Sequence, residues 1–138
     1  MDRYERRRLS VLCRHLAGRV KYLKGGDFRY KSDPESADCV KIIRYVIEKH
    51  TRYEIPINWV HELPTDLFNN GAKIIDPVVE DLDVGDLIFV RNPCTKSNRI
   101  AHVAIIASSR PFRVFHCSRK HGGTVIEKLT HFVNRYEQ

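Results

Sequence analysis

The stretch that decides the fold spans residues 100–117 and reads IAHVAIIASSRPFRVFHC. Two apolar runs, Ile100–Ala107 and Phe112–Cys117, flank a short polar segment, which is the pattern of two antiparallel strands joined by a turn. Similar strand patterns lie on both sides of this hairpin, over Leu87–Arg91 and Thr124–Lys128.

His102 and His116 lie one on each arm of the hairpin. A turn centred near Ser109 places them directly opposite each other or one position apart. Their even separation in the sequence predicts that both point from the same face of the sheet, where directly opposed Cβ atoms are about 5 Å apart. One imidazole can then support the other.

Helical periodicity marks the chain before these strands. Leu9, Leu12 and Leu16 recur at helical spacing, which predicts a helix from Asp2 to Ala17. A second helix is predicted by an apolar stripe within residues 38–50, made of Ile42, Ile43, Val46 and Ile47.

The remaining segments read as connections. A polar, glycine-bearing loop is expected over Lys24–Ser36, and a short helix over Thr65–Asn70. Helices followed by consecutive short strands indicate an α+β domain, with an antiparallel sheet of about five strands packed against the N-terminal helices. We expect residues 1–138 to form one domain, because 138 residues with 42% hydrophobic and 30% charged side chains is ordinary globular composition.

Several observations limit where the protein acts. No apolar run is long enough to span a bilayer, and the charged first ten residues lack the apolar core of a signal peptide. The expectation is a chain that is cytoplasmic as made and stays there, that reaches the cell envelope or the outside by another route, or that has been trimmed. The 4 cysteines are scattered, so we expect reduced thiols.

The formal net charge of +7 attracts polyanions such as cell-wall polymers, anionic lipid or nucleic acid. A solvated basic face explains this charge without a dedicated surface. No base-stacking motif or zinc-finger spacing is present, so nucleic acid is not the expected partner. We expect a monomer.

Cys39 has the surroundings of a nucleophile. Asp38 is a good N-cap, which places Cys39 in the first turn of its helix, where unpaired backbone N–H groups favour a thiolate. Paired with His102 as general base and ion-pair partner, the thiol is expected to have a pKa below neutrality. His116 then orients His102, with His121 as its rival for that role.

Each of these residues also has a plain structural interpretation. A cysteine on an apolar helix face is often a buried structural thiol, and His102 can be a hydrogen-bonded sheet histidine. A zinc site is not expected, because Cys117 with His121 lacks the paired ligands of such sites.

Five segments, taken together, resemble a known family: GRVKYLKGG at 18–26, DC at 38–39, GDLIF at 85–89, HVAII at 102–106 and FH at 115–116. In order, spacing and strand context the chain resembles the NlpC-type cell-wall cysteine peptidases, a branch of the papain-like fold. The resemblance implies hydrolysis of an amide bond in the stem peptide of peptidoglycan, typically between D-glutamate and the following diamino acid, without a metal or organic cofactor.

By position, the resemblance implies that Cys39 is the nucleophile, His102 the base and His116 the orienting residue. It also implies substrate-binding positions, which are Tyr22, Asp38 and Val40. The chain departs from the family where Val40 replaces a serine and Ala104 replaces a glycine. We expect Val40 to reshape the pocket that faces the substrate.

Three functions follow as hypotheses. The first is a cysteine amidase acting on peptidoglycan peptides. The second is an effector or toxin with the same scaffold that cleaves an amide in a protein or another substrate. The third is a non-enzymatic basic domain that binds anionic polymers.

Overall fold

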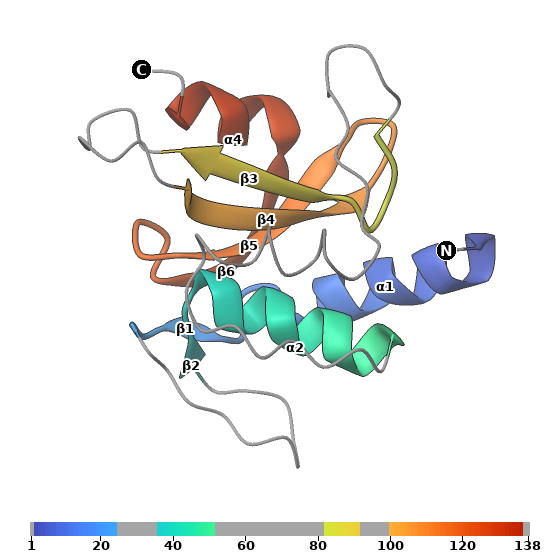
Figure 1. Ribbon diagram of the computed structural model, residues 1–138, viewed down its shortest axis with the longest axis horizontal. Helices are drawn as coiled ribbons and strands as arrows, with labels where there is room; N and C mark the ends of the chain where they lie inside the picture. Colours follow the sequence, from blue (N-terminus) through green and yellow to red (C-terminus); the bar gives the residue numbers. More distant parts are fainter. Residues whose placement is uncertain (1, 25–35, 52–81, 92–99, 137–138) are drawn as a thin grey trace.

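A six-stranded sheet carries helices on both of its faces (Figure 1). The computed structural model describes residues 2–24, 36–51, 82–91 and 100–136. The elements in chain order are α1 Arg3–Leu16, β1 Lys21–Tyr22, β2 Ser36–Ala37, α2 Cys39–Thr51, β3 Leu87–Arg91, β4 Ile100–Ser108, β5 Arg113–Ser118, β6 Gly123–Lys128 and α4 Leu129–Tyr136.

The strands lie in the order β2-β1-β6-β5-β4-β3. The pair β1–β2 is parallel, and the other neighbouring pairs are antiparallel. The predicted α+β class is confirmed, with six strands in place of about five. The two strands that match none of the four strand patterns in the sequence are β1 and β2, which have 2 residues each and are too short for an alternating pattern.

The side-chain carboxylates of Asp2 and Asp38 cap the N-termini of the first two helices. Asp2 accepts a hydrogen bond from the Glu5 backbone N–H at 2.8 Å. Asp38 accepts one from the Lys41 N–H at 2.9 Å, which confirms the predicted N-cap and places Cys39 at the first helical position. The predicted short helix over 65–70 and most of the loop over 24–36 lie outside the described residues.

Each sheet face has its own apolar core, because alternate residues of β4 and β5 point to opposite sides. On one face α1 and α2 pack against Val103, Ile105 and Phe115. On the other, Phe132 of α4 packs with Ala104, Ile106 and Val114. Figure 1 shows α4 on one side of the sheet and α1 with α2 on the other.

The pairing of β4 with β5 departs from the predicted register. Ile105 pairs with Phe115, and continuing that register puts His116 two positions away from the residue opposite His102. The expectation that the histidines are directly opposed or one step apart is therefore wrong. The cause is the position of the turn: Ile105 pairs with Phe115 and Ile106 with Val114, which centres the hairpin at Arg110, one residue beyond the predicted Ser109.

Near the histidines, the described residues of β4 and β5 are not paired with each other in the sheet. Within the described residues their pairing ends at Ile105 and Phe115, although β4 begins at Ile100 and β5 continues to Ser118. The two strands therefore separate at the end where His102 and His116 lie. In the described part of the chain, no helix combines the length and apolar character needed to cross a membrane.

Candidate active site

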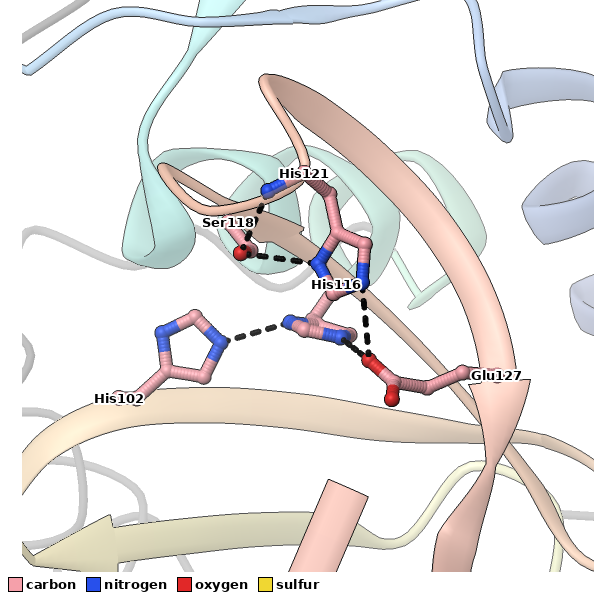
Figure 2. Close-up of polar contacts among 5 residues, drawn as sticks. All are labelled: His102, His116, Ser118, His121 and Glu127. Carbon is pink, nitrogen blue, oxygen red and sulfur yellow. Dashed lines mark hydrogen bonds and ion pairs between the residues drawn. The ribbon is translucent and has the colours of Figure 1, made fainter. Parts of the chain in front are cut away.

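The two strand histidines are in direct contact. His102 Nε2 lies 2.7 Å from His116 Nδ1, and the ring planes are 84° apart (Figure 2). Diagonal neighbours on adjacent strands remain within reach of ring side chains, so the contact survives the shifted register. The prediction that both rings share one sheet face is confirmed, and His116 is completely buried.

Glu127 extends this contact into a chain of three groups. Its Oε2 lies 2.5 Å from His116 Nε2, and its side chain is only 10% exposed. Val125 of β6 pairs with His116, so Glu127 lies two positions further along β6 and on the same face. Sequence reasoning missed this residue, although an acidic side chain within an apolar strand was a signal for it.

The chain of contacts assigns a tautomer to each ring. A carboxylate accepts hydrogen bonds and does not donate them, so the proton shared with Glu127 belongs to His116 Nε2. Neutral His116 then accepts at Nδ1, and His102 donates from Nε2. The Nδ1 of His102 keeps its lone pair, which is the form that a general base requires.

Phe132 of α4 packs against the two histidine rings on their face of the sheet. Its completely buried ring lies 4.9 Å from the His116 ring centroid and 5.9 Å from that of His102. Because α4 directly follows β6, the strand that supplies Glu127 also places this ring. The imidazoles are thus fixed by packing as well as by hydrogen bonds.

His121 lies against His116 and not against His102. Its Nδ1 is 3.1 Å from Ser118 Oγ, and its Nε2 is 4.0 Å from Glu127 Oε2. Of the two candidates for the orienting role, His116 is the one hydrogen-bonded to His102. Among the described residues, His116, His121 and Glu127 form the group that could hold a metal ion.

Cys39 lies at the N-terminus of α2, beside the point where β4 and β5 separate. The Val103 backbone N–H, which directly follows His102 in the chain, points toward the Cys39 sulfur. Nearby, the Cys117 thiol donates a hydrogen bond to the Ala37 carbonyl at 3.3 Å. The start of α2 therefore approaches both strands where they no longer pair with each other.

The thiol is not ionised by these surroundings. Burial, followed by the charge of Asp38, raises the pKa of Cys39 to about 11, whereas the N–H groups of Val103, Val40 and Cys39 itself lower it. The expectation of a pKa below neutrality is therefore wrong, because desolvation of a thiolate outweighs the helix-terminal N–H groups. Within the described residues, no hydrogen bond joins the Cys39 sulfur to either imidazole.

The other predicted site residues have different surroundings. Tyr22 is partly buried, and the pKa of its phenol is raised by burial and by the nearby Cys39. The carboxylate of Asp38 caps α2. Val40 is 2% exposed and belongs to the apolar core that α1 and α2 share with the sheet, so the expectation that it contacts substrate is corrected: a side chain with this burial is not open to a ligand.

Comparisons with known proteins agree with this architecture. No protein-family model matches the chain, and no curated protein matches it. The structure of NlpC2 from Trichomonas vaginalis is similar over 91% of this chain and 42% of that protein, with a TM-score of 0.63 and 17% identity. NlpC1 from the same organism is similar over 93% of this chain and 40% of that protein, with a TM-score of 0.65 and 18% identity. The chain spans about two fifths of the length of these proteins, and the likeness shows that its fold is the papain-like fold of the NlpC type.

Proposed function

We propose that the chain is a cysteine amidase that uses Cys39 as nucleophile, His102 as general base and His116 as orienting residue. The observation that carries this proposal is the chain of contacts from Glu127 through His116 to His102, which ends one residue from the N–H that points at the Cys39 sulfur. Such a chain prepares one ring nitrogen to accept a proton beside a thiol.

The raised pKa of Cys39 favours general-base catalysis over a resting ion pair. As the sulfur attacks the amide carbonyl carbon, His102 Nδ1 takes the thiol proton, and the carbonyl oxygen becomes an oxyanion. The imidazolium that forms is stabilised through His116 by the carboxylate of Glu127. Apo sites of this kind commonly tighten when substrate binds, so the missing sulfur–imidazole hydrogen bond is compatible with this role.

Completion of the cycle uses the same groups. The backbone N–H of Cys39, which has no intrahelical carbonyl to donate to at the first position of α2, donates to the oxyanion. His102 then gives its proton to the leaving amine, the C–N bond breaks, and a thioester forms on Cys39. A water molecule, deprotonated by His102, cleaves the thioester and restores the thiol.

The proposed substrate is a peptidoglycan stem peptide, cleaved between D-glutamate and the following diamino acid. Two features support this choice: the NlpC-type fold, and the net charge of +7, which attracts anionic wall polymers. Tyr22 is proposed to line the binding site, because it lies close enough to Cys39 for a charge on that sulfur to raise the pKa of its phenol.

The test is digestion of purified peptidoglycan fragments, followed by mass spectrometry of the products. The wild-type chain should release the peptide cut after D-glutamate, and Cys39→Ala should release none. Cys13→Ala, which changes a buried thiol of α1, is the matched control and should keep full activity. Equal cleavage by Cys39→Ala would refute the mechanism, and wild-type cleavage at a different amide would refute the substrate.

A further inference from the structure

Three potential metal ligands lie close together beside the His102–His116 pair. The ligand atoms of His116, His121 and Glu127 all lie within 4.8 Å of one another. The carboxylate faces both Nε2 atoms, at 2.5 Å from His116 and 4.0 Å from His121 (Figure 2). They come from β5, from the turn that follows it and from β6, so a single hairpin supplies all three.

Both imidazoles are held by their other nitrogen. Nδ1 of His116 contacts His102 at 2.7 Å, and Nδ1 of His121 contacts Ser118 Oγ at 3.1 Å. In metal sites a ligating histidine almost always has its second ring nitrogen hydrogen-bonded, which fixes the direction of the ligating one. The two Nε2 atoms here are oriented in this manner toward a shared carboxylate.

The donor set suits zinc. Two imidazole nitrogens and one carboxylate oxygen are ordinary zinc ligands, and three protein ligands leave a fourth position for water. A tetrahedral site with zinc–ligand bonds near 2.0–2.1 Å needs ligand atoms about 3.3 Å apart. The carboxylate oxygen lies 2.5 and 4.0 Å from the two Nε2 atoms, and all three ligand atoms lie within 4.8 Å of one another, so side-chain shifts of the size that accompany metal binding would bring them to that spacing. His121 is 29% exposed and lies in a turn, which gives an ion access from solvent.

We propose that His116, His121 and Glu127 bind a zinc ion, and that the bound ion switches off the base of the active site. Zinc can bind His116 Nε2 only in the tautomer that has no proton on that nitrogen, so the proton that Nε2 shared with Glu127 is replaced by zinc and the neutral ring carries its proton on Nδ1. His116 then donates to His102 Nε2, and the proton of His102 moves to its Nδ1. That nitrogen can no longer accept the thiol proton. The binding site stands on geometry alone, whereas the loss of activity rests on the proposed function.

Zinc binding is measured first in a Cys39→Ala background, because a cysteine thiolate is itself a zinc ligand. The probes are zinc, in competition with a chromophoric chelator, and cobalt, whose visible absorption reports tetrahedral coordination. The test variant is His121→Gln, and His15→Gln is the control, since His15 is an exposed histidine of α1. Far-UV circular dichroism and the metal-free melting temperature establish that each variant is folded.

The expected result is stoichiometric zinc binding in Cys39→Ala and in its His15→Gln derivative, with tetrahedral cobalt absorption. His121→Gln should weaken zinc binding by at least about tenfold, since even loss of a residue that only orients a ligand costs about 10–100-fold. Absence of binding in Cys39→Ala overturns the proposal, as does equal affinity with and without His121.

Activity gives a second, separate readout in chains that retain Cys39. Zinc should inhibit hydrolysis by the wild type, and inhibition of His121→Gln, measured against its own metal-free rate, should need at least about tenfold more zinc. If the chain binds zinc as described but cleaves no peptidoglycan fragment, the proposed function fails and the metal site stands. If both proteins are inhibited at the same zinc concentration, the switch is wrong.

Discussion

Replacing Glu127 by glutamine should slow turnover by about an order of magnitude while leaving the fold intact. Glu127 contacts His116 and not the sulfur, so it acts by positioning and by charge. Glutamine keeps the length of the side chain and one oxygen acceptor, but it removes the negative charge that stabilises an imidazolium. The substitution therefore measures how much the negative charge of the Glu127 carboxylate contributes to catalysis, separately from the size of the side chain.

The magnitude follows from the contact itself. The Oε2–Nε2 distance is 2.5 Å, and both side chains are shielded from solvent, with exposed fractions of 10% and 0%. A hydrogen bond to a charged group contributes about 1.5–3 kcal/mol, against about 0.5–1.5 kcal/mol for a neutral one. The difference of about 1–1.5 kcal/mol corresponds to a rate reduction of about five- to twelvefold.

The assay is the initial rate of stem-peptide hydrolysis as a function of substrate concentration. The loss should appear in kcat with KM unchanged, because the imidazolium forms only as the thiol is deprotonated. Glu48→Gln is the matched control: Glu48 is 16% exposed and lies 3.2 Å from Arg44 on α2, on the other face of the sheet. Its kcat should stay within about twofold of the wild type, because its contact stabilises a helix surface by only about 0.3–0.5 kcal/mol.

Wild-type kcat in Glu127→Gln would refute the role of the carboxylate. An equal reduction in Glu48→Gln would show that the effect is one of general stability. A change confined to KM would place Glu127 in contact with substrate, which contradicts its position behind His116.

Further predictions concern packing and the state of the thiol. Phe132→Ala should lower the free energy of unfolding by about 3–5 kcal/mol in urea titrations, because a completely buried ring is lost between α4 and the sheet; a loss under 1 kcal/mol would contradict the described packing. Gly123→Ala should cost about 1–3 kcal/mol in the same assay, since its Cβ would clash with the Val20 carbonyl oxygen; unchanged stability would show that residue 20 approaches β6 less closely. Alkylation of Cys39 by iodoacetamide should increase about tenfold per pH unit from pH 7 to 10, because a pKa of about 11 leaves the thiolate scarce until the pH approaches that value; a rate that levels off above pH 9 would indicate an ordinary thiol. Cys13, with a pKa raised by burial to about 12, should react more slowly throughout.

Local patterns in the chain predict most of the elements. The helical stripes locate α1 and α2 to within a residue or two, and the apolar runs locate β3 to β6. The N-cap at Asp38 and the first-turn position of Cys39 are also local, because capping involves residues three apart in the chain. The even spacing of His102 and His116 sufficed to place both on one face.

The sequence by itself therefore determined the class of fold, the start of the cysteine helix and the shared face of the two histidines. Only the tertiary structure decided the register of β4 against β5, the inclusion of Glu127, and the burial that raises the pKa of Cys39. The physical reason is range: periodicity and capping depend on neighbours within a few residues. Register, contact across three strands and desolvation depend on how distant segments pack together.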